Sequence, residues 1–179
     1  MTNSVNRQGL VSLLTALLLF VVTTNVSARG VYQTNEAFLN EVYDQTVPKS
    51  DVIWLKGEVR EQVKKILGHN YNGLRIRYWK QNNRSTWILE EIGKEEPITF
   101  GIVINGDSVE KVKVLAYRES RGWEVKHPAF TQQFNDAKLK NQALDRNIDG
   151  ITGATLSVRA MTAVVTLALY LDDFVSTLS

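Results

Sequence analysis

The side chains with the clearest potential for chemistry lie together near the C-terminus, in residues 149–157 (Asp-Gly-Ile-Thr-Gly-Ala-Thr-Leu-Ser). Hydroxyl groups and two glycines come immediately before an apolar run that is typical of a helix. The first turn of a helix has N–H groups without intrahelical partners and the positive end of the helix dipole, so this position favours anions, phosphate in particular. The alternative is simple capping, in which Thr152 or Thr155 is the N-cap and Asp149 fixes the turn.

The helix that must present this segment is the most clearly defined element of the sequence. From about Ala154 to Thr177 there is no Gly or Pro, and residues 160–171 carry no charge. An uncharged stretch of 12 residues is short for a membrane span and favours a buried core helix.

Two shorter amphipathic helices are predicted nearer the N-terminus. In Asn35–Gln45, Phe38 and Val42 share one helical face behind a capping Thr34 or Asn35. In Glu58–Leu67 apolar residues recur at helical spacing, with acids in the first turn and lysines in the last, and Gly68 is the stop signal.

Between these helices and the C-terminal helix the apolar period changes to two, which predicts two antiparallel hairpins. The predicted strands are residues 74–80, 85–92, 98–104 and 109–117. Their turns fall at Gln81-Asn82-Asn83 and Asn105-Gly106-Asp107. The order of elements indicates an α+β fold, in which an antiparallel sheet of about four or more strands packs with the N-terminal helices and a long buried C-terminal helix.

Composition narrows the class of protein. The 179 residues are 44% hydrophobic and 22% charged, which suits one globular domain. A net charge of +2 spread along the chain is too weak to favour nucleic acid as a partner. The chain has no cysteine, which excludes disulfides, thiolate metal sites and Cys nucleophiles. Redox chemistry would therefore require a bound cofactor.

The N-terminal residues 1–28 have the layout of a secretory signal peptide. Arg7 precedes the 13-residue apolar run Leu10–Val22, and Val26-Ser27-Ala28 offers a cleavage site after Ala28. The alternative is an uncleaved membrane anchor, because the uncharged stretch Gln8–Ala28 has 21 residues. In both cases residues 29–179 form one domain that we expect in the periplasm or elsewhere outside the cytoplasm.

The segment around Thr155 resembles the flavinylation motif of the FMN-binding domain family. That motif is an Asp, two residues, Ser or Thr, and then Gly-Ala-Thr, as in the C subunit of the sodium-translocating NADH:quinone oxidoreductase and the G subunit of the Rnf complex. Its fixed places are filled here by Asp149, Thr152, Gly153, Ala154 and Thr155. The resemblance extends over about residues 98–171, and the chain is similar to small exported single-domain members.

The resemblance implies FMN as a covalent cofactor. In the family a separate flavin transferase joins FMN through its phosphate to the last threonine of the motif, which is Thr155 here. Gly150 and Gly153 would leave room for the phosphate and the transferase, and the backbone from Ala154 through Leu156 to Ser157 would supply N–H groups. The implied function is an electron-transfer flavoprotein whose partners are membrane or periplasmic redox proteins.

A second segment, Glu119-Ser120-Arg121-Gly122-Trp123, lies where the family has an acidic, glycine-containing loop that borders the flavin. The resemblance makes Glu119, Gly122 and Trp123 candidate cofactor contacts. This chain departs from the respiratory subunits because Trp123 and Glu124 stand where those subunits carry a second glycine. Trp123 either stacks on the flavin ring or is a partly buried loop aromatic.

Two other functions remain open from the sequence alone. A flavin-dependent reductase with its own small substrate would need positioned acid or base groups, for which Arg121 and His127 are the candidates. The other alternative is a non-redox binding module that carries the same fold. The two histidines are far apart in the sequence and there are no thiols, so the chain shows no spacing typical of a metal site.

Overall fold

The computed structural model describes residues 30–178, so the predicted signal peptide lies outside the described residues. Its centre is an antiparallel six-stranded sheet in the order β1-β6-β5-β4-β3-β2. The strands are β1 (Gly30–Val31), β2 (Ser50–Trp54), β3 (Arg75–Gln81), β4 (Arg84–Ile92), β5 (Pro97–Asn105) and β6 (Ser108–Tyr117). This confirms the predicted α+β class and both predicted hairpins.

The central hairpin, β5–β6, turns more tightly than the three-residue loop predicted from the sequence. Asn105 pairs with Ser108, so only Gly106 and Asp107 form the loop. Gly106 has a φ of +65°, as expected at the first position of a type II′ turn, and such turns match the twist of paired strands. The hairpin also contains two register shifts, at Thr99/Phe100 and at Val103/Ile104.

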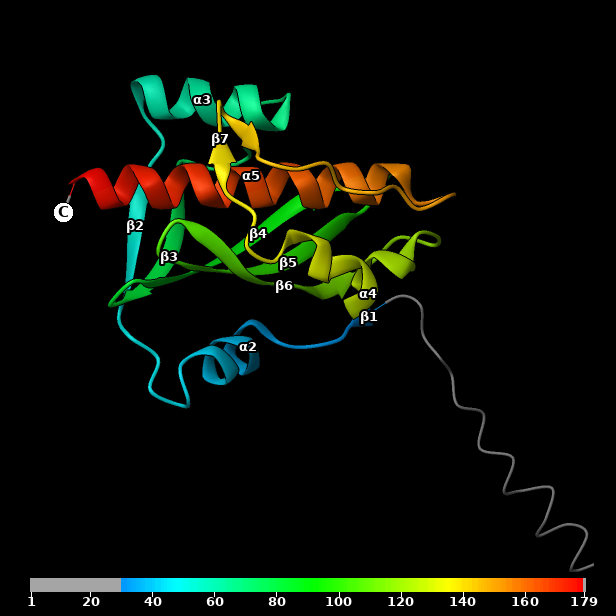
Figure 1. Cartoon of the computed structure of the whole chain (residues 1–179), viewed down its shortest axis with the longest axis horizontal. Coiled ribbons are helices and arrows are strands. Elements are labelled where there is room, and N and C mark those ends of the chain that lie inside the picture. The colour runs from blue at the N-terminus through cyan, green and yellow to red at the C-terminus, as the bar shows by residue number, and fades with distance from the viewer. Residues whose placement is uncertain (1–29, 179) are drawn as a thin grey trace, which may run out of the picture.

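One face of the sheet carries the long helix α5 (Thr155–Leu178), with α3 (Gly57–Leu67) beyond it (Figure 1). The predicted C-terminal helix is confirmed to within a residue at each end. By length and composition α5 is the one described helix able to cross a membrane, but it packs on β4, β5 and β6 and its apolar residues are largely buried. The main core lies between this helix and the sheet, and includes Trp87, Phe100, Met161, Leu167 and Leu171.

The opposite face of the sheet carries the short helix α2 (Asn35–Val42). The Thr34 hydroxyl accepts a hydrogen bond from the Ala37 N–H at 3.1 Å, which identifies Thr34 as the N-cap. At the other end the Arg84 guanidinium donates to the Val42 carbonyl at 3.3 Å.

A small apolar cluster joins α2 to the sheet. Phe38 is fully buried, and its ring lies against Gly101 of β5, where a Cβ atom would come within 2.6 Å of the Phe38 Cζ. Only glycine at position 101 lets this ring reach the sheet. The buried members of the cluster are Phe38, Leu39, Val42, Tyr43, Val103 and Leu115.

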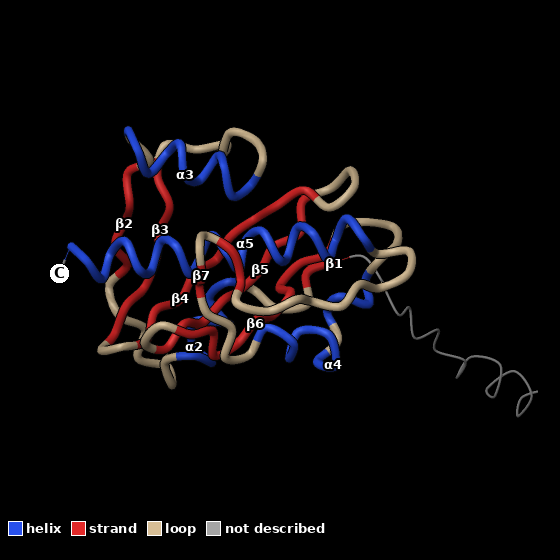
Figure 2. Tube along the Cα trace, turned by 45° about the horizontal axis from the view of Figure 1, so that its top comes forward, coloured by secondary structure: helices blue, strands red, loops and turns tan. Residues whose placement is uncertain are grey.

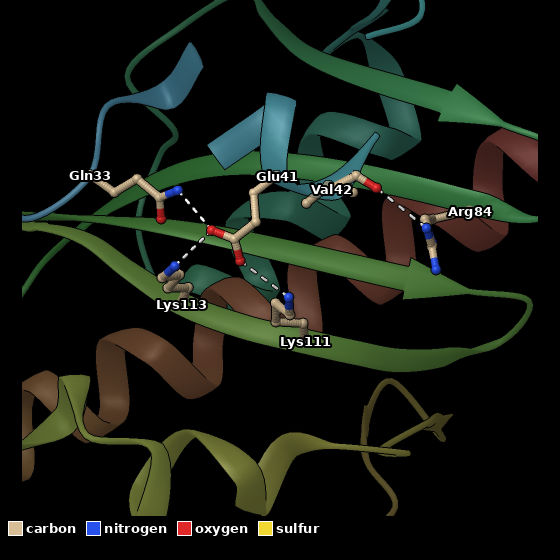
Figure 3. A network of polar contacts seen from close by, with 6 residues as sticks. All are labelled: Gln33, Glu41, Val42, Arg84, Lys111 and Lys113. Carbon is tan, nitrogen blue, oxygen red and sulfur yellow. Dashed lines mark hydrogen bonds and ion pairs between the residues drawn. The ribbon is translucent and has the colours of Figure 1, made fainter. Parts of the chain in front are cut away.

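A polar network around Glu41 borders this cluster (Figure 3). The Glu41 carboxylate accepts from Lys113 at 2.9 Å, from Gln33 at 2.8 Å and from Lys111 at 3.3 Å. Hydrogen bonds from Lys113 and Gln33 lower the pKa of Glu41 to about 2, against the opposing effect of burial. The network ties α2 to the neighbouring strand β6.

Short elements connect β6 to α5. They are η1 (Trp123–Lys126), α4 (Pro128–Thr131) and η2 (Gln132–Phe134), followed by a two-stranded sheet of β7 (Leu139–Lys140) and β8 (Ala143–Leu144). Residues 128–134 thus form one α-helical turn followed by a 3-10 turn. After β8 the chain runs back alongside α5 to reach the start of that helix (Figure 2).

Candidate functional site

The start of α5 is formed by a tight turn. The Ala154 N–H donates to the Ile151 carbonyl at 2.9 Å, and Gly153 has a φ of +83° at the third position, as type II turns require. Thr155 is then the first helical residue. A side chain at position 153 would be strained, because L-residues rarely adopt this conformation.

The first turn of α5 leaves a donor set for an anion. The Ala154 N–H is already bonded within the turn, which corrects the expectation that it would also bind phosphate. The N–H groups of Thr155, Leu156 and Ser157 precede the first helical hydrogen bond, which the Val158 N–H donates to the Ala154 carbonyl. Three N–H groups at the positive end of a 24-residue helix suit a phosphate.

The hydroxyls of Thr152 and Thr155 do not behave as caps. Both residues are exposed, and neither hydroxyl forms a hydrogen bond to any residue between 30 and 178. Ala154 occupies the place before the first helical residue, where a capping side chain would stand. The Thr155 hydroxyl is therefore accessible at the mouth of the helix.

The loop after β6 is held against this helix start by Tyr117. Its hydroxyl lies 2.9 Å from the buried Ser157 Oγ and also donates to the Arg121 carbonyl. Burial raises the pKa of Tyr117, which favours the protonated phenol that this donation requires.

Gly122 fits into the same contact. It has a φ of +84°, and a Cβ atom there would lie 2.8 Å from the Tyr117 hydroxyl and 3.0 Å from Ser157 Oγ. Both the backbone conformation and the close approach require glycine at this position. The Ser157 side chain therefore has a positioning role, because its hydroxyl is bonded to Tyr117.

Glu119 positions a third segment, the β4–β5 loop. Its carboxylate accepts from the backbone N–H groups of Lys94, Glu95 at 2.6 Å and Glu96 at 3.0 Å. A Cβ atom at Gly93 would approach Glu119 Oε1 to 2.9 Å, so the carboxylate fits closely under the loop. Burial raises the pKa of Glu119, but the three backbone hydrogen bonds outweigh it and the pKa lies below its usual range.

These three segments enclose a cavity of about 570 Å³ at the start of α5. Its lining residues are Lys94, Glu95, Glu119, Ser120, Arg121, Gly153, Ala154, Thr155, Leu156 and Ser157. The volume lies within the range of ligand sites, roughly 300 to 1,000 Å³. Lys94, Arg121 and the helix N–H groups favour an anion, and the accessible Thr155 hydroxyl lies in the same wall. The donor set therefore fits the phosphate end of FMN.

Several residues of the sequence-predicted site lie outside this cavity. Gly122 and Trp123 are not among the described residues that line it, and neither are Asp149, Gly150 and Thr152. The Asp149 backbone N–H donates to the Gln133 side-chain oxygen at 2.8 Å. This contact is made by the backbone, so the role expected for the Asp149 carboxylate stays a prediction.

Trp123 instead packs within its own loop. Its ring meets the His127 ring edge to face at 5.1 Å, and the Lys126 ammonium lies over it at 5.1 Å from the ring centre. Lys126 also lies 4.0 Å from the ring centre of Tyr32. This arrangement fits the partly buried loop aromatic better than a ring free to stack on a cofactor.

The cavity contains residues that the sequence did not single out. Lys94 and Glu95 form its far wall, and Tyr117 holds two of its segments together. The sequence around each of these residues contains no motif, because each reaches the cavity only through contacts with a segment distant in the chain. Within residues 30–178 no group of His, Asp and Glu side chains could hold a metal ion.

Comparison with known proteins agrees with the geometry. The FMN-binding domain family matches residues 93–170, a span that begins at the β4–β5 loop and includes Glu119, Thr155 and most of α5. A search of curated proteins finds no match. Residues 93–170 are therefore an FMN-binding domain, and they contain all the residues that line the cavity at the start of α5.

Proposed function

We propose that this protein is an exported flavoprotein that carries FMN covalently on Thr155 and transfers electrons between a membrane redox partner and an acceptor outside the cytoplasm. The observation that carries the proposal is the accessible Thr155 hydroxyl, which opens on a cavity at the start of α5 inside an FMN-binding domain. Lys94, Arg121 and the helix N–H groups offer this cavity anion-binding donors beside the acids Glu95 and Glu119. FMN supplies one- and two-electron chemistry when it is bound, and the protein supplies binding and electrostatics.

The residues proposed to hold the cofactor divide into two groups. The N–H groups of Thr155, Leu156 and Ser157 and the side chain of Arg121 would hold the phosphate. Lys94 adds a second positive charge in the far wall. Its partner Glu95 at 3.1 Å is exposed, so this ion pair is weak and leaves the ammonium available.

Attachment requires a phosphoester bond at the Thr155 oxygen. In the proposed step the hydroxyl loses its proton to a base of the flavin transferase, and its oxygen bonds to the flavin phosphorus. A P–O bond of an activated flavin dinucleotide breaks, and the second nucleotide leaves with its phosphate. No oxidation or reduction takes place in this step.

The decisive experiment compares Thr155→Ala with Thr155→Ser and Thr152→Ala, each produced together with a flavin transferase. Mass spectrometry of the tryptic peptide Asn147–Arg159 should show the FMN mass in the wild type and in Thr152→Ala, and none in Thr155→Ala. Thr155→Ser keeps a hydroxyl and tests whether the attachment needs the threonine methyl group. FMN on this peptide in Thr155→Ala would overturn the assignment.

We propose that the flavin exchanges electrons with partner proteins and not with a small substrate. A reductase with its own substrate remains the second candidate, because Arg121 lines the cavity and could bind a small anion. His127 does not line the cavity among the described residues, and its ring packs on Trp123. Saturable turnover of a small substrate that is lost in Arg121→Gln would favour the reductase, whereas rapid electron exchange with a membrane flavoprotein or an exported cytochrome supports the carrier.

Export is part of the proposal. Cleavage after Ala28 would leave Arg29 directly before β1, so the whole described fold would remain in the mature protein. N-terminal sequencing of the protein from its native host tests this. A chain that begins at residue 29 in a soluble envelope fraction supports the signal peptide, and an intact N-terminus in the membrane fraction would indicate the anchor.

A further inference from the structure

A second hollow lies along the side of α5, more than one helical turn from Thr155. It is a groove of about 750 Å³ between the end of α3, the β7–β8 region and α5. Its walls are formed by residues 62, 65–68, 141–144, 146–148, 159, 162, 163 and 166. None of them lines the cavity at Thr155, so the two hollows are separate.

The residues that line the groove carry positive charge, and no acidic residue is among its described walls. Three of its residues are cationic, Lys65, Arg146 and Arg159. The Arg146 charge is compensated, because its guanidinium pairs with the Asp145 carboxylate at 3.0 Å. The Lys65 ammonium bonds only to the neutral Gln142 side chain at 2.9 Å, and between residues 30 and 178 Arg159 forms no hydrogen bond or ion pair. Two uncompensated cations therefore border the groove.

A buried amide in the same wall also lacks a partner. The Nε2 atom of Gln62 is buried and donates to no acceptor within the described part of the chain. Nearly all buried polar atoms in proteins are hydrogen-bonded, and an unmade bond is costly. An oxygen acceptor in the groove would satisfy this donor.

The rest of the groove is apolar. Ile66, Leu67, Leu144, Ile148 and Ala163 contribute aliphatic surface beside the cations. A ligand that covers this surface gains from apolar burial, and one that also carries an anionic oxygen gains from Lys65, Arg159 and Gln62.

We propose that this groove binds a small organic anion that has an apolar ring or chain. The anionic oxygen contacts Arg159 and Lys65, a second acceptor oxygen bonds Gln62 Nε2, and the apolar body covers the aliphatic wall. The groove volume suits such a molecule, since small-molecule sites span roughly 300 to 1,000 Å³. This site is independent of the proposed attachment of FMN at Thr155.

The probe for the test is 8-anilino-1-naphthalenesulfonate, and its neutral control is N-phenyl-1-naphthylamine, which has the same rings without the sulfonate. Each is titrated into the full chain by isothermal calorimetry. The anion should bind to one site and release heat, and the neutral amine should bind about tenfold or more weakly, because it cannot make a charge-assisted hydrogen bond.

Charge variants locate the site. Arg159→Gln should weaken the anion about tenfold to a hundredfold, and Lys65→Gln roughly threefold to tenfold. Their matched controls are Arg77→Gln on the exposed part of β3 and Lys64→Gln, the residue before Lys65, which does not line the groove. Both controls remove the same charge and should leave the affinity unchanged to within about twofold.

A third variant separates binding from stability. Gln62→Leu removes the unpartnered donor, so the melting temperature of the ligand-free chain should rise by roughly 2 to 4 °C. The same variant should bind the anion about threefold or more weakly. In the wild type, the side-chain amide resonance of Gln62, identified by its loss in this variant, should shift when the anion is added.

The outcomes are distinguishable. Equal affinity for the anion and the neutral amine overturns the proposal, and so does an Arg159→Gln protein that binds as well as its Arg77→Gln control. Binding that is unchanged in both Arg159→Gln and Lys65→Gln would place the probe on another apolar surface. That result also overturns the proposal. Loss of FMN in Thr155→Ala leaves these results unchanged, so this proposal and the proposed function are tested separately.

Discussion

The two faces of the sheet are stabilised in different ways. On the α5 face, a long helix buries thirteen of its residues against three central strands and α3. On the α2 face, an eight-residue helix contributes three buried residues and depends on one ring over Gly101 and on the Glu41 network. The first face is stabilised by extensive apolar burial, and the second by a small apolar cluster with one close contact and by surface charges.

This difference bears on where the site lies. The candidate cavity is at the start of α5, so Thr155 belongs to the helix with the most extensive packing in the described chain. A site on a rigid element holds its donors in a fixed geometry. The α2 face carries none of the residues that line the cavity.

The largest predicted effect tests the burial on the α5 face. Leu167 is fully buried in the core between α5 and the sheet. Leu167→Ala removes its contacts and leaves a cavity, so it should destabilise the protein by about 2 to 5 kcal/mol in urea unfolding. Exposed Leu178→Ala on the same helix is the control, and we expect a change within about 0.5 kcal/mol. Similar losses for both variants would contradict the assignment of the stability of this face to apolar burial.

The next effect tests the close contact on the α2 face. Gly101→Ala places a Cβ atom against the buried Phe38 ring, which has no free space to move into. Overpacking of this kind should cost about 1 to 3 kcal/mol. Phe38→Leu in the same chain should recover part of the loss, because the smaller side chain makes room. If Gly101→Ala is as stable as the wild type, α2 is not held as described.

A smaller effect is expected at the edge of the cavity. Glu119→Gln keeps the shape of the side chain but loses the charge that accepts three backbone N–H groups, and should cost about 1 to 2 kcal/mol. Because the pKa of Glu119 is lowered on folding, its contribution is present above the ordinary value of 4.5 and is lost as the pH falls below it. Urea unfolding at pH 7 and pH 3 should therefore show a difference from wild type that shrinks in acid.

The smallest effect concerns the Glu41 network. Glu41 and its lysine partners are partly exposed, so Glu41→Gln should cost only about 0.2 to 1 kcal/mol at neutral pH. The pKa of Glu41 is about 2 in the fold and 4.5 as the reference value, so this contribution is lost as the pH falls through that interval. Raising the salt concentration at pH 7 should reduce it as well. A cost that is independent of both pH and salt would mean that packing, and not charge, holds α2 here.

The long elements of this fold could be predicted from the sequence because their signals are local. The absence of Gly and Pro after Ala154 predicted α5 to within a residue, and Gly68 ends α3 in the left-handed conformation typical of its type. Strands β1 and β2 were not predicted. They have two and five residues, and their pairing with β6 and β3 is a long-range contact that no local pattern encodes.

The candidate site was predictable in part for the same reason. Thr155, Gly153 and Ala154 belong to one continuous motif, and Glu119 and Gly122 belong to a recognisable loop. Their partners Lys94 and Tyr117 are identified only when the strands are assembled, because a backbone N–H and a phenol hydroxyl reach across the fold. Trp123 was a candidate from the same loop, but the structure places it outside the residues that line the cavity.

The position of β1 has a consequence for how the site meets its partners. Gly30 pairs with Tyr117, the residue whose hydroxyl contacts Ser157 beside the cavity. Any segment joined to Gly30 therefore enters the fold at the cavity end. An uncleaved anchor would confine this end to a thin layer above the lipid, where a tether of few residues gives an effective concentration in the millimolar range. If a membrane donor reduces the domain as proposed, cleavage removes this advantage and leaves their encounter to free diffusion, so N-terminal processing would slow the reduction.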